Sequence, residues 1–334
     1  MLAAVTFGAS APFAARLGRH ADAQLLAGML YLGASAALIP AVVIRRPEGE
    51  AGLRRVDLRS LVVLTALGGV VAPVLLLVGL QRTGGLSGSL LLNLEGPLTV
   101  AVAVLAMGEH LSRRALVGGG AIVVAAAAMG AVPGSLRVDP VGIVLIALAC
   151  VGWALDNNLT VRLATRDPRV VVSVKVGVAG AVNLAVALGR GVAVPGVRVV
   201  SGALVLGAVA YGVSVLLDAY ALRLIGAARE AVLFAMAPFA GVVVAMVGFG
   251  GTLSRLTAAA MVLMGIGVAV TLTDRHGHPH SHVAVTHGHR HRHDDDHHDH
   301  HVGDAPAVHA HEHHHDPLVH AHGHASEVHH RHEH

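Results

Sequence analysis

The sequence has few charged residues, few aromatic side chains and almost no cysteine. Only 13% of its 334 residues are charged and 54% are hydrophobic, whereas soluble domains carry about 25% charged residues. This balance argues against a water-soluble globular protein. The single cysteine, Cys150, excludes an internal disulfide and a zinc site built from cysteines. The basic residues are scattered between apolar runs and do not gather with aromatic residues, so no nucleic-acid partner is expected.

Histidine is distributed very unevenly along the chain. Of the 26 histidines, all but His20 and His110 lie in residues 274–334. That segment lacks apolar periodicity, so we predict a disordered, polar, His-rich tail. The remaining residues, 1–273, form an apolar body.

The apolar body divides into runs that are separated by Arg, Asp, Pro and Gly. A bilayer core of about 30 Å requires about 20 apolar residues in a helix, and on this basis we predict ten transmembrane helices. The first run begins at Met1 and others follow it, so we interpret it as a membrane span and not as a cleaved signal; whether the N-terminus is complete stays open. The predicted spans cover residues 1–18, 23–44, 60–81, 86–108, 114–132, 140–161, 169–189, 199–222, 230–250 and 256–273.

The arginines predict the orientation of these spans. Loops that lie on the same side as the N-terminus carry more arginines than loops on the other side. The loop after the second span contributes most, with Arg45, Arg46, Arg54, Arg55 and Arg59. Because basic loops face the cytoplasm, we expect both the N- and C-termini to be cytoplasmic.

The two halves of the body resemble each other. Residues 80–114 read LQRTGGLSGSLLLNLEGPLTVAVAVLAMGEHLSRR, and residues 221–255 read ALRLIGAAREAVLFAMAPFAGVVVAMVGFGGTLSR. Aligning them places Pro97 opposite Pro238. Each half holds five spans, so the second copy enters the membrane from the opposite side, as in the inverted repeats that build alternating access around a midplane site.

The predicted fold is therefore an all-α polytopic membrane protein with ten helices in two inverted five-helix repeats. The first repeat covers residues 1–132, the second 139–273, and the tail 274–334. A duplication that serves only as a scaffold is the alternative to transport.

Several segments carry a resemblance to a known family. They are FGASAPFAARL in the first span, the NLEGP, GEHLSRR and GGGAIVV block, and ACVGWALDNNLTVRL at the opening of the second half. On these segments residues 1–273 resemble the EamA-type drug/metabolite transporters. The resemblance implies export or exchange of small metabolites across the inner membrane, no enzyme activity and no required cofactor.

Ionisable side chains within membrane spans are costly and are candidates for function. Our hypothesis is that Glu95 and Lys175, with Asp156, Asn157 and Asn158, line a central cavity and relay protons. Two alternatives stay open: a structural ion pair of Lys175 with Glu95 or Asp156, or a Lys175 that reaches toward the membrane boundary. The other polar candidates in the pathway are Asn93 and Asp218. Glu230, beside Arg229, marks the start of the ninth span.

Two further groups of residues have predicted structural roles. Asn183 is interpreted as a hydrogen-bonding link between helices. Prolines within spans remove a helical hydrogen bond, and we predict helix kinks at Pro12, Pro73, Pro97 and Pro238.

The tail is rich in the imidazole nitrogens that Zn, Cu and Ni accept as ligands. It is predicted to bind divalent metals without selectivity, and a solvated tail that titrates with pH is the alternative. The candidate ligands are His287, His289, His291, His293, His297, His298, His300, His301, His311, His313, His314, His315, His320, His322 and His324.

Three classes of function follow from these patterns. The first is a secondary transporter of a small metabolite, and the second is an efflux carrier for Ni, Co or Zn whose tail collects or senses metal. A metal-storage or scaffold protein is the third, and it does not require an inverted repeat. In every case the lipid bilayer is a partner, and in the first two classes a small molecule or ion is the substrate. Whether the chain forms a homodimer stays open.

Overall fold

The structure is a computed structural model of the chain. It describes residues 1–43, 51–83, 88, 91–107, 113–130, 139–164, 166–235, 237–250, 255–272, 276–282, 285–292, 308–315 and 318–324.

The described elements of the first half of the body are all helical. Its elements are α1 (Leu2–Leu17), α2 (Ala23–Val43), the 3-10 turn η1 (Arg55–Asp57), α3 (Leu58–Leu64), the π-helical η2 (Thr65–Val71), α4 (Ala72–Thr83), the 3-10 turn η3 (Leu92–Leu94), α6 (Glu95–Met107) and α7 (Arg113–Gly130).

The second half repeats this order. Its elements are α8 (Pro140–Arg162), α9 (Pro168–Gly189), α10 (Val197–Leu206), the π-helical η4 (Gly207–Val213), α11 (Ser214–Phe234), α12 (Ala237–Phe249) and α13 (Arg255–Leu272). In each half the third span contains the π-helical segment, η2 in the first and η4 in the second.

The predicted membrane spans are confirmed as apolar helical segments. In the described residues, five helices are long and apolar enough to cross a membrane, and five more apolar helices are shorter. Together they occupy the ten predicted positions. The fold is therefore that of a polytopic helical membrane protein.

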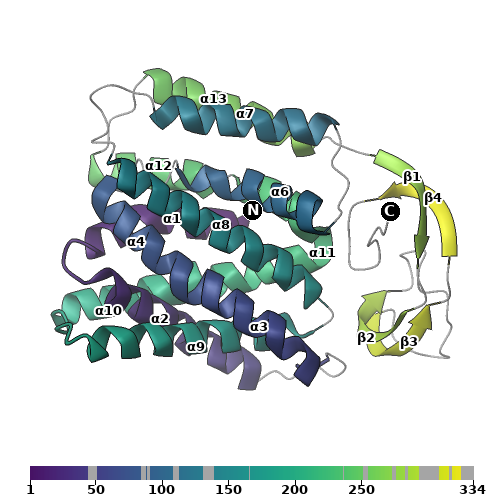
Figure 1. The fold of residues 1–334 in the computed structure, drawn as a ribbon, viewed down its shortest axis with the longest axis horizontal. Coiled ribbons are helices and arrows are strands. Elements are labelled where there is room, and N and C mark those ends of the chain that lie inside the picture. Colours follow the sequence, from purple (N-terminus) through teal and green to yellow (C-terminus); the bar gives the residue numbers. More distant parts are fainter. Residues whose placement is uncertain are drawn as a thin grey trace.

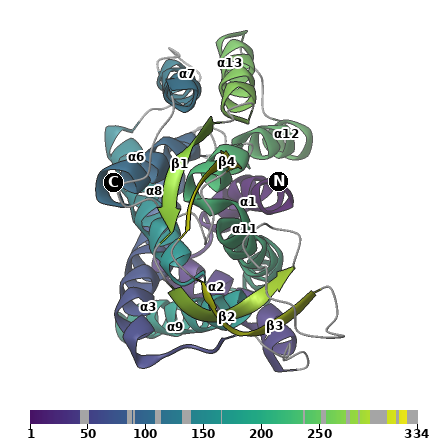
Figure 2. The same ribbon diagram turned by 90° about the vertical axis from the view of Figure 1, so that its right-hand side faces the viewer.

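The packing of the two halves is symmetric. The second spans of the two halves, α2 and α9, pack together. The fifth spans, α7 and α13, also pack together and lie side by side in Figures 1 and 2. The contact of α6 with α8 has its counterpart in the contact of α12 with α1. Exchanging equivalent spans thus reproduces the contact pattern, as a two-fold axis between the halves requires.

The helical run of residues 197–234 reverses its direction. A straight helix rises about 1.5 Å per residue, which would place Tyr211 and Phe234 roughly 35 Å apart. Both rings nevertheless lie with their centroids 5.5 Å from that of Phe7. The run therefore folds back between these residues, so that α11 supplies the end of the eighth span and the beginning of the ninth.

The π-helical segment η2 lies directly before Pro73, which has no N–H to donate to the carbonyl of Gly69 four residues earlier. Asn183 on α9 donates to that carbonyl instead, at 3.3 Å. The neighbouring Gly68 carbonyl accepts from Tyr31 Oη at 3.2 Å and from Trp153 Nε1 at 3.0 Å. Side chains of three helices thus donate hydrogen bonds to the carbonyl groups of the widened turn. Backbone polar groups buried in a membrane need such partners.

Replacing Asn183 with alanine is expected to lower the free energy of unfolding by about 1–3 kcal/mol, because the Gly69 carbonyl then loses its side-chain donor. Tyr31→Phe is the matched control, and we expect it to cost only about 0.6 kcal/mol, because Trp153 still donates to Gly68. Unfolding in mixed micelles of detergent and dodecyl sulfate measures both. Equal losses for the two variants would contradict the role of Asn183.

The four prolines differ in their positions. Pro12 lies inside α1 and Pro73 follows the π-helical turn. Pro97 and Pro238 lie in the first turns of α6 and α12, where the missing N–H costs no helical hydrogen bond. At these two positions the proline therefore begins a helix and does not bend the middle of one.

Ion pairs join the ends of several helices. Arg82 Nη1, at the end of α4, lies 2.6 Å from Asp139 Oδ2 at the start of α8, and this hydrogen bond holds the pKa of the Asp139 carboxyl below its usual value. Near the opposite ends of these helices, Arg166 pairs with Asp57 at 2.7 Å.

The described part of the tail forms four strands, where the sequence analysis predicts disorder. These strands are β1 (His276–His282), β2 (Val285–Arg292), β3 (Val308–His315) and β4 (Leu318–His324). β1 pairs with β4 and β2 with β3, both antiparallel, and the strands lie at one end of the helical body (Figures 1 and 2). Histidine alternates with other residues in much of this segment, and a period of two is the period of a strand.

Candidate functional site

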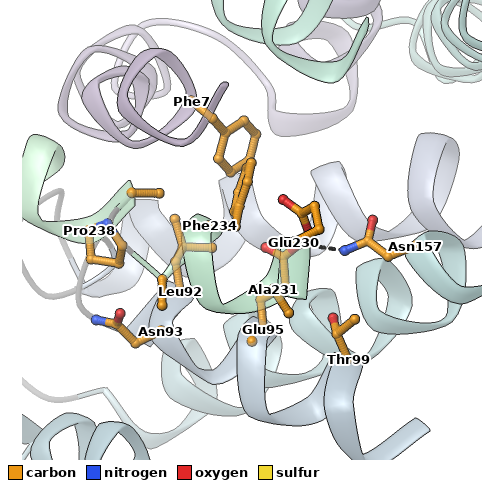
Figure 3. Close-up of a pocket in the computed structure, with 13 residues that line it drawn as sticks. Phe7, Leu92, Asn93, Glu95, Thr99, Asn157, Glu230, Ala231, Phe234 and Pro238 are labelled. Atoms are coloured by element: carbon orange, nitrogen blue, oxygen red, sulfur yellow. Dashed lines mark hydrogen bonds between the residues drawn. The ribbon is translucent and has the colours of Figure 1, made fainter. Parts of the chain in front are cut away.

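A small cavity lies between the two halves of the body. The first half supplies α1, η3 and α6 to its wall, and the second half supplies α8, α11 and α12 (Figure 3). Its internal volume is about 10 Å³, which is room for about one water molecule. A metabolite can enter only after the surrounding helices separate. The lining residues are Phe7, Leu92, Asn93, Glu95, Gly96, Thr99, Asn157, Glu230, Ala231, Phe234, Ala235, Ala237 and Pro238.

Glu95 and Asn157 connect the two halves across this cavity. Asn157 Nδ2 on α8 donates to Glu95 Oε1 on α6 at 3.1 Å (Figure 3). Both side chains are buried, with exposed fractions of 8% for Asn157 and 9% for Glu95. These two predicted pathway residues are therefore in direct contact at the interface of the repeats.

Lys175 pairs with Asp156 and not with Glu95. The ammonium group of Lys175 on α9 donates to Asp156 Oδ2 on α8, and both side chains are buried. The pair faces the π-helical segment, because an added Cβ at Gly68 would lie 2.2 Å from Asp156 Oδ2. Of the alternatives that the sequence left open, the structure has the Asp156–Lys175 ion pair, and neither residue lines the cavity.

The remaining asparagines of the hypothesis have different positions. Asn158 Nδ2 donates to the carbonyls of Thr99 at 3.0 Å and Ala154 at 2.8 Å, which links α8 to α6 outside the cavity wall. Asn93 lines the cavity, and its Nδ2 lies 3.2 Å from Met264 Sδ on α13. The structure thus divides the predicted set, because consecutive residues on a helix point about 100° apart.

Asp218 and Glu230 form a carboxyl pair beside the cavity. They lie on the two arms of the reversing helical run, close enough to interact electrostatically. Two neighbouring buried carboxyl groups repel each other when both are ionised, which favours a state in which one of them carries a proton. Glu230 is 3% exposed and lines the cavity, whereas Asp218 lies behind it.

Aromatic rings are concentrated on one side of the cavity. Phe7 and Phe234 line it, with their ring centroids 5.5 Å apart, and Trp153 and Tyr211 pack edge-on against Phe7. Tyr31 continues the cluster through Tyr211. A chain with few aromatic residues therefore gathers five of them next to its buried carboxyl groups.

Sequence reasoning placed Glu230 only at the boundary of the ninth span, and it did not single out Thr99, Phe7 or Phe234. An ionisable residue in an apolar run was the signal for Glu230. Thr99 and the two phenylalanines gave no local signal, since such residues are common in any membrane helix.

The metal prediction concerns only the tail. In the described part of the chain no group of three or more His, Cys, Asp or Glu side chains could hold a metal ion. His293, His297, His298, His300 and His301 lie outside the described residues. The other predicted ligands lie in β2, β3 and β4, of which the backbone pairing alone is described.

Symmetric halves of apolar helices around a small cavity with buried polar side chains in its wall define a polytopic membrane protein of the kind that carries solutes. The chain belongs to the EamA-like transporter family, whose model matches residues 1–131 and 140–273. This family consists of transporters and not of enzymes.

Individual comparisons agree with this assignment. The chain is similar to an "Uncharacterized transporter" of Methanothermobacter thermautotrophicus, with 30% identity over 210 residues, and the match covers 61% of this chain and 61% of that protein. A solved structure described as "Crystal structure of protein" has a TM-score of 0.62 and 20% identity, and the match covers 80% of this chain and 93% of that chain. At this identity the second likeness shows the fold alone.

Proposed function

We propose that this protein is a secondary transporter that exports or exchanges a small metabolite across the inner membrane by alternating access. The observation that carries the proposal is the small cavity between two symmetric halves, in which Glu95 of one half contacts Asn157 of the other. Buried ionisable groups at a repeat interface are typical of substrate and coupling-ion sites. Coupling to protons is part of the proposal, because the cavity holds carboxyl groups that bind and release protons.

The symmetry of the contacts supports a rocking mechanism. The contact of α6 with α8 and that of α1 with α12 both join the two halves. If a two-fold axis relates the halves, the opposite state of the transporter is reached by exchanging their conformations. The cavity then opens alternately to either side, while the ion pair of Asp156 with Lys175 stays between α8 and α9, which both pack against η2.

Glu95→Gln is expected to reduce transport at least about tenfold, a loss of roughly 1.4 kcal/mol. The variant keeps an oxygen for Asn157 but loses the charge and the exchangeable proton of the cavity wall. Cells that overproduce the wild type, the variant or neither are compared by untargeted metabolite analysis of cells and medium. The compounds that change with the wild type identify the substrate.

Asp139→Asn is the matched control, because this carboxyl group lies outside the cavity in an exposed pair with Arg82. We expect it to transport as the wild type does. If Glu95→Gln changes the same metabolites to the same extent as the wild type, the cavity is not the transport path. No observation in the described part of the chain favours the metal-efflux alternative over metabolite transport.

A further inference from the structure

The cavity wall is built to accept hydrogen bonds and positive charge. Its polar residues are Asn93, Glu95, Thr99, Asn157 and Glu230, and none of the described lining residues is Lys, Arg or His. Asp218 adds a third carboxyl group directly behind Glu230. The carboxyl groups of this wall therefore favour a ligand that supplies hydrogen-bond donors.

Two acceptor atoms of the wall lack a partner in the described structure. Glu230 Oε2 and Thr99 Oγ1 have no hydrogen-bond partner, although the exposed fractions of the residues are 3% and 0%. They come from different helices, α11 and α6, and both line the cavity. A buried polar atom without a partner costs about 1–3 kcal/mol, and a donor that enters the cavity would remove this cost at both atoms.

The aromatic side of the cavity suits a cation that carries an apolar group. Phe7 and Phe234 line it with ring planes inclined by 46°. Ring faces attract ammonium groups within about 6 Å, most strongly when water is excluded. Carboxyl groups and phenyl rings in the wall of one cavity are complementary to an organic ammonium ion.

The charged groups around the Asp218–Glu230 pair are compatible with a preference for a cationic ligand. The cations that interact with the carboxyl pair are the amino group of Met1, which precedes α1, and Lys175, which is already paired with Asp156. The groups that face the Asp218–Glu230 pair from the packed elements are Met1 before α1, Glu95 on α6, Asp156 on α8 and Lys175 on α9. Together with Asp218 and Glu230 themselves, these groups make four carboxyl groups and two cations.

We propose that the cavity binds an organic ammonium ion in exchange for the proton that the Asp218–Glu230 pair holds. This inference rests on the proposed transport function and names its substrate class. On binding, the N–H groups of the cation donate to Glu230 and Thr99, and the proton between the two carboxyl groups leaves to solvent. One positive charge enters and one leaves, so the charge of the site is unchanged. Proton and substrate thereby compete for one site, which makes the carrier an exchanger of protons for organic cations.

The test is a binding titration of the purified full chain in detergent. The probes are methylammonium, ethylammonium and 2-phenylethylammonium, with 2-phenylethanol and phenylacetate as neutral and anionic counterparts. We expect the ammonium probes alone to bind, 2-phenylethylammonium most tightly. Affinity should rise about tenfold per pH unit while one proton is released for each cation bound. The sign follows from competition, since a protonated pair at low pH excludes the cation.

Variants identify the atoms responsible. Glu230→Gln should weaken binding at least about tenfold and abolish its pH dependence, whereas Glu230→Asp keeps both in part and Asp139→Asn leaves them unchanged. Thr99→Val, which retains the shape of the side chain, should weaken binding without removing the pH dependence. Size-exclusion chromatography identifies variants that fail to fold.

Failure of this inference is distinguishable from failure of the transport proposal. Binding of phenylacetate as tight as that of 2-phenylethylammonium, cation binding without proton release, or no binding of any ammonium probe would overturn the inference. The metabolite comparison of cells gives the second readout. If overproduction of the wild type changes the amounts of only neutral or anionic metabolites, the protein is a transporter but the inferred substrate class is wrong. If no metabolite changes, transport itself is contradicted.

Discussion

Replacing Lys175 with methionine is expected to destabilise the folded protein by about 3–5 kcal/mol, the usual cost of leaving one partner of a buried ion pair uncompensated. The Asp156 side chain is 2% exposed, its Oδ1 has no hydrogen-bond partner, and its Oδ2 is bonded to Lys175. Because both side chains of the pair are buried, little water can reach Asp156 to replace the lysine. Thermal unfolding in detergent and unfolding by dodecyl sulfate measure the loss.

Two variants separate this effect from simple truncation. The double variant Asp156→Asn with Lys175→Met removes both charges, and we expect most of the stability to return. Arg190→Met breaks an exposed pair with Asp22, whose charged atoms are 3.9 Å apart, and it should change stability by less than about 1 kcal/mol. If Lys175→Met costs no more than Arg190→Met, the buried pair has no special role.

Alanine at Gly8 is expected to prevent the two halves from closing and to abolish transport. An added Cβ at Gly8 would lie 1.7 Å from the carbonyl oxygen of Ala237. Both atoms belong to backbone, so α1 and α12 must move apart, at a cost of about 3 kcal/mol or more in this closed state. Transport and thermal stability of the Gly8→Ala variant test the expectation.

Gly120→Ala on α7 is the control for this substitution. No atom lies within 4 Å of a Cβ added there, and alanine in place of glycine stabilises a helix by about 0.5–1 kcal/mol. We therefore expect this variant to transport normally and to be slightly more stable. Normal transport by Gly8→Ala would show that the contact of α1 with α12 does not have to be so close.

The spans could be predicted because the signal for each of them is local. A run of apolar residues such as 140–161 becomes a helix in lipid whatever lies beside it, and α8 was found at Pro140–Arg162. The repeat was visible for the same reason, since the motifs around Pro97 and Pro238 remain in the sequence. The strands of the tail lie in segments whose composition indicates disorder, and the alternation of histidine is a local signal for them.

The candidate site could be predicted only in part. Glu95, Asn157 and Asn93 do line the cavity, whereas Asp156 and Lys175 form a separate pair at the π-helical turn. Asp156 and Asn157 are neighbours in the chain, but a helix turns them to different partners. Sequence spacing shows that two side chains point in different directions from a helix. It does not show which neighbouring helix each side chain contacts.

The sequence by itself determined the ten apolar spans, the five-span repeat and the short set of ionisable residues that lipid makes costly. The tertiary structure decided how those residues are grouped. It joined Lys175 to Asp156, brought Asp218 to Glu230 through the reversal within α11, and placed Phe7 and Phe234 beside them. The physical reason is that hydrophobic length is a property of one segment, whereas a buried charge is stabilised by groups that only the packing of several helices brings to it.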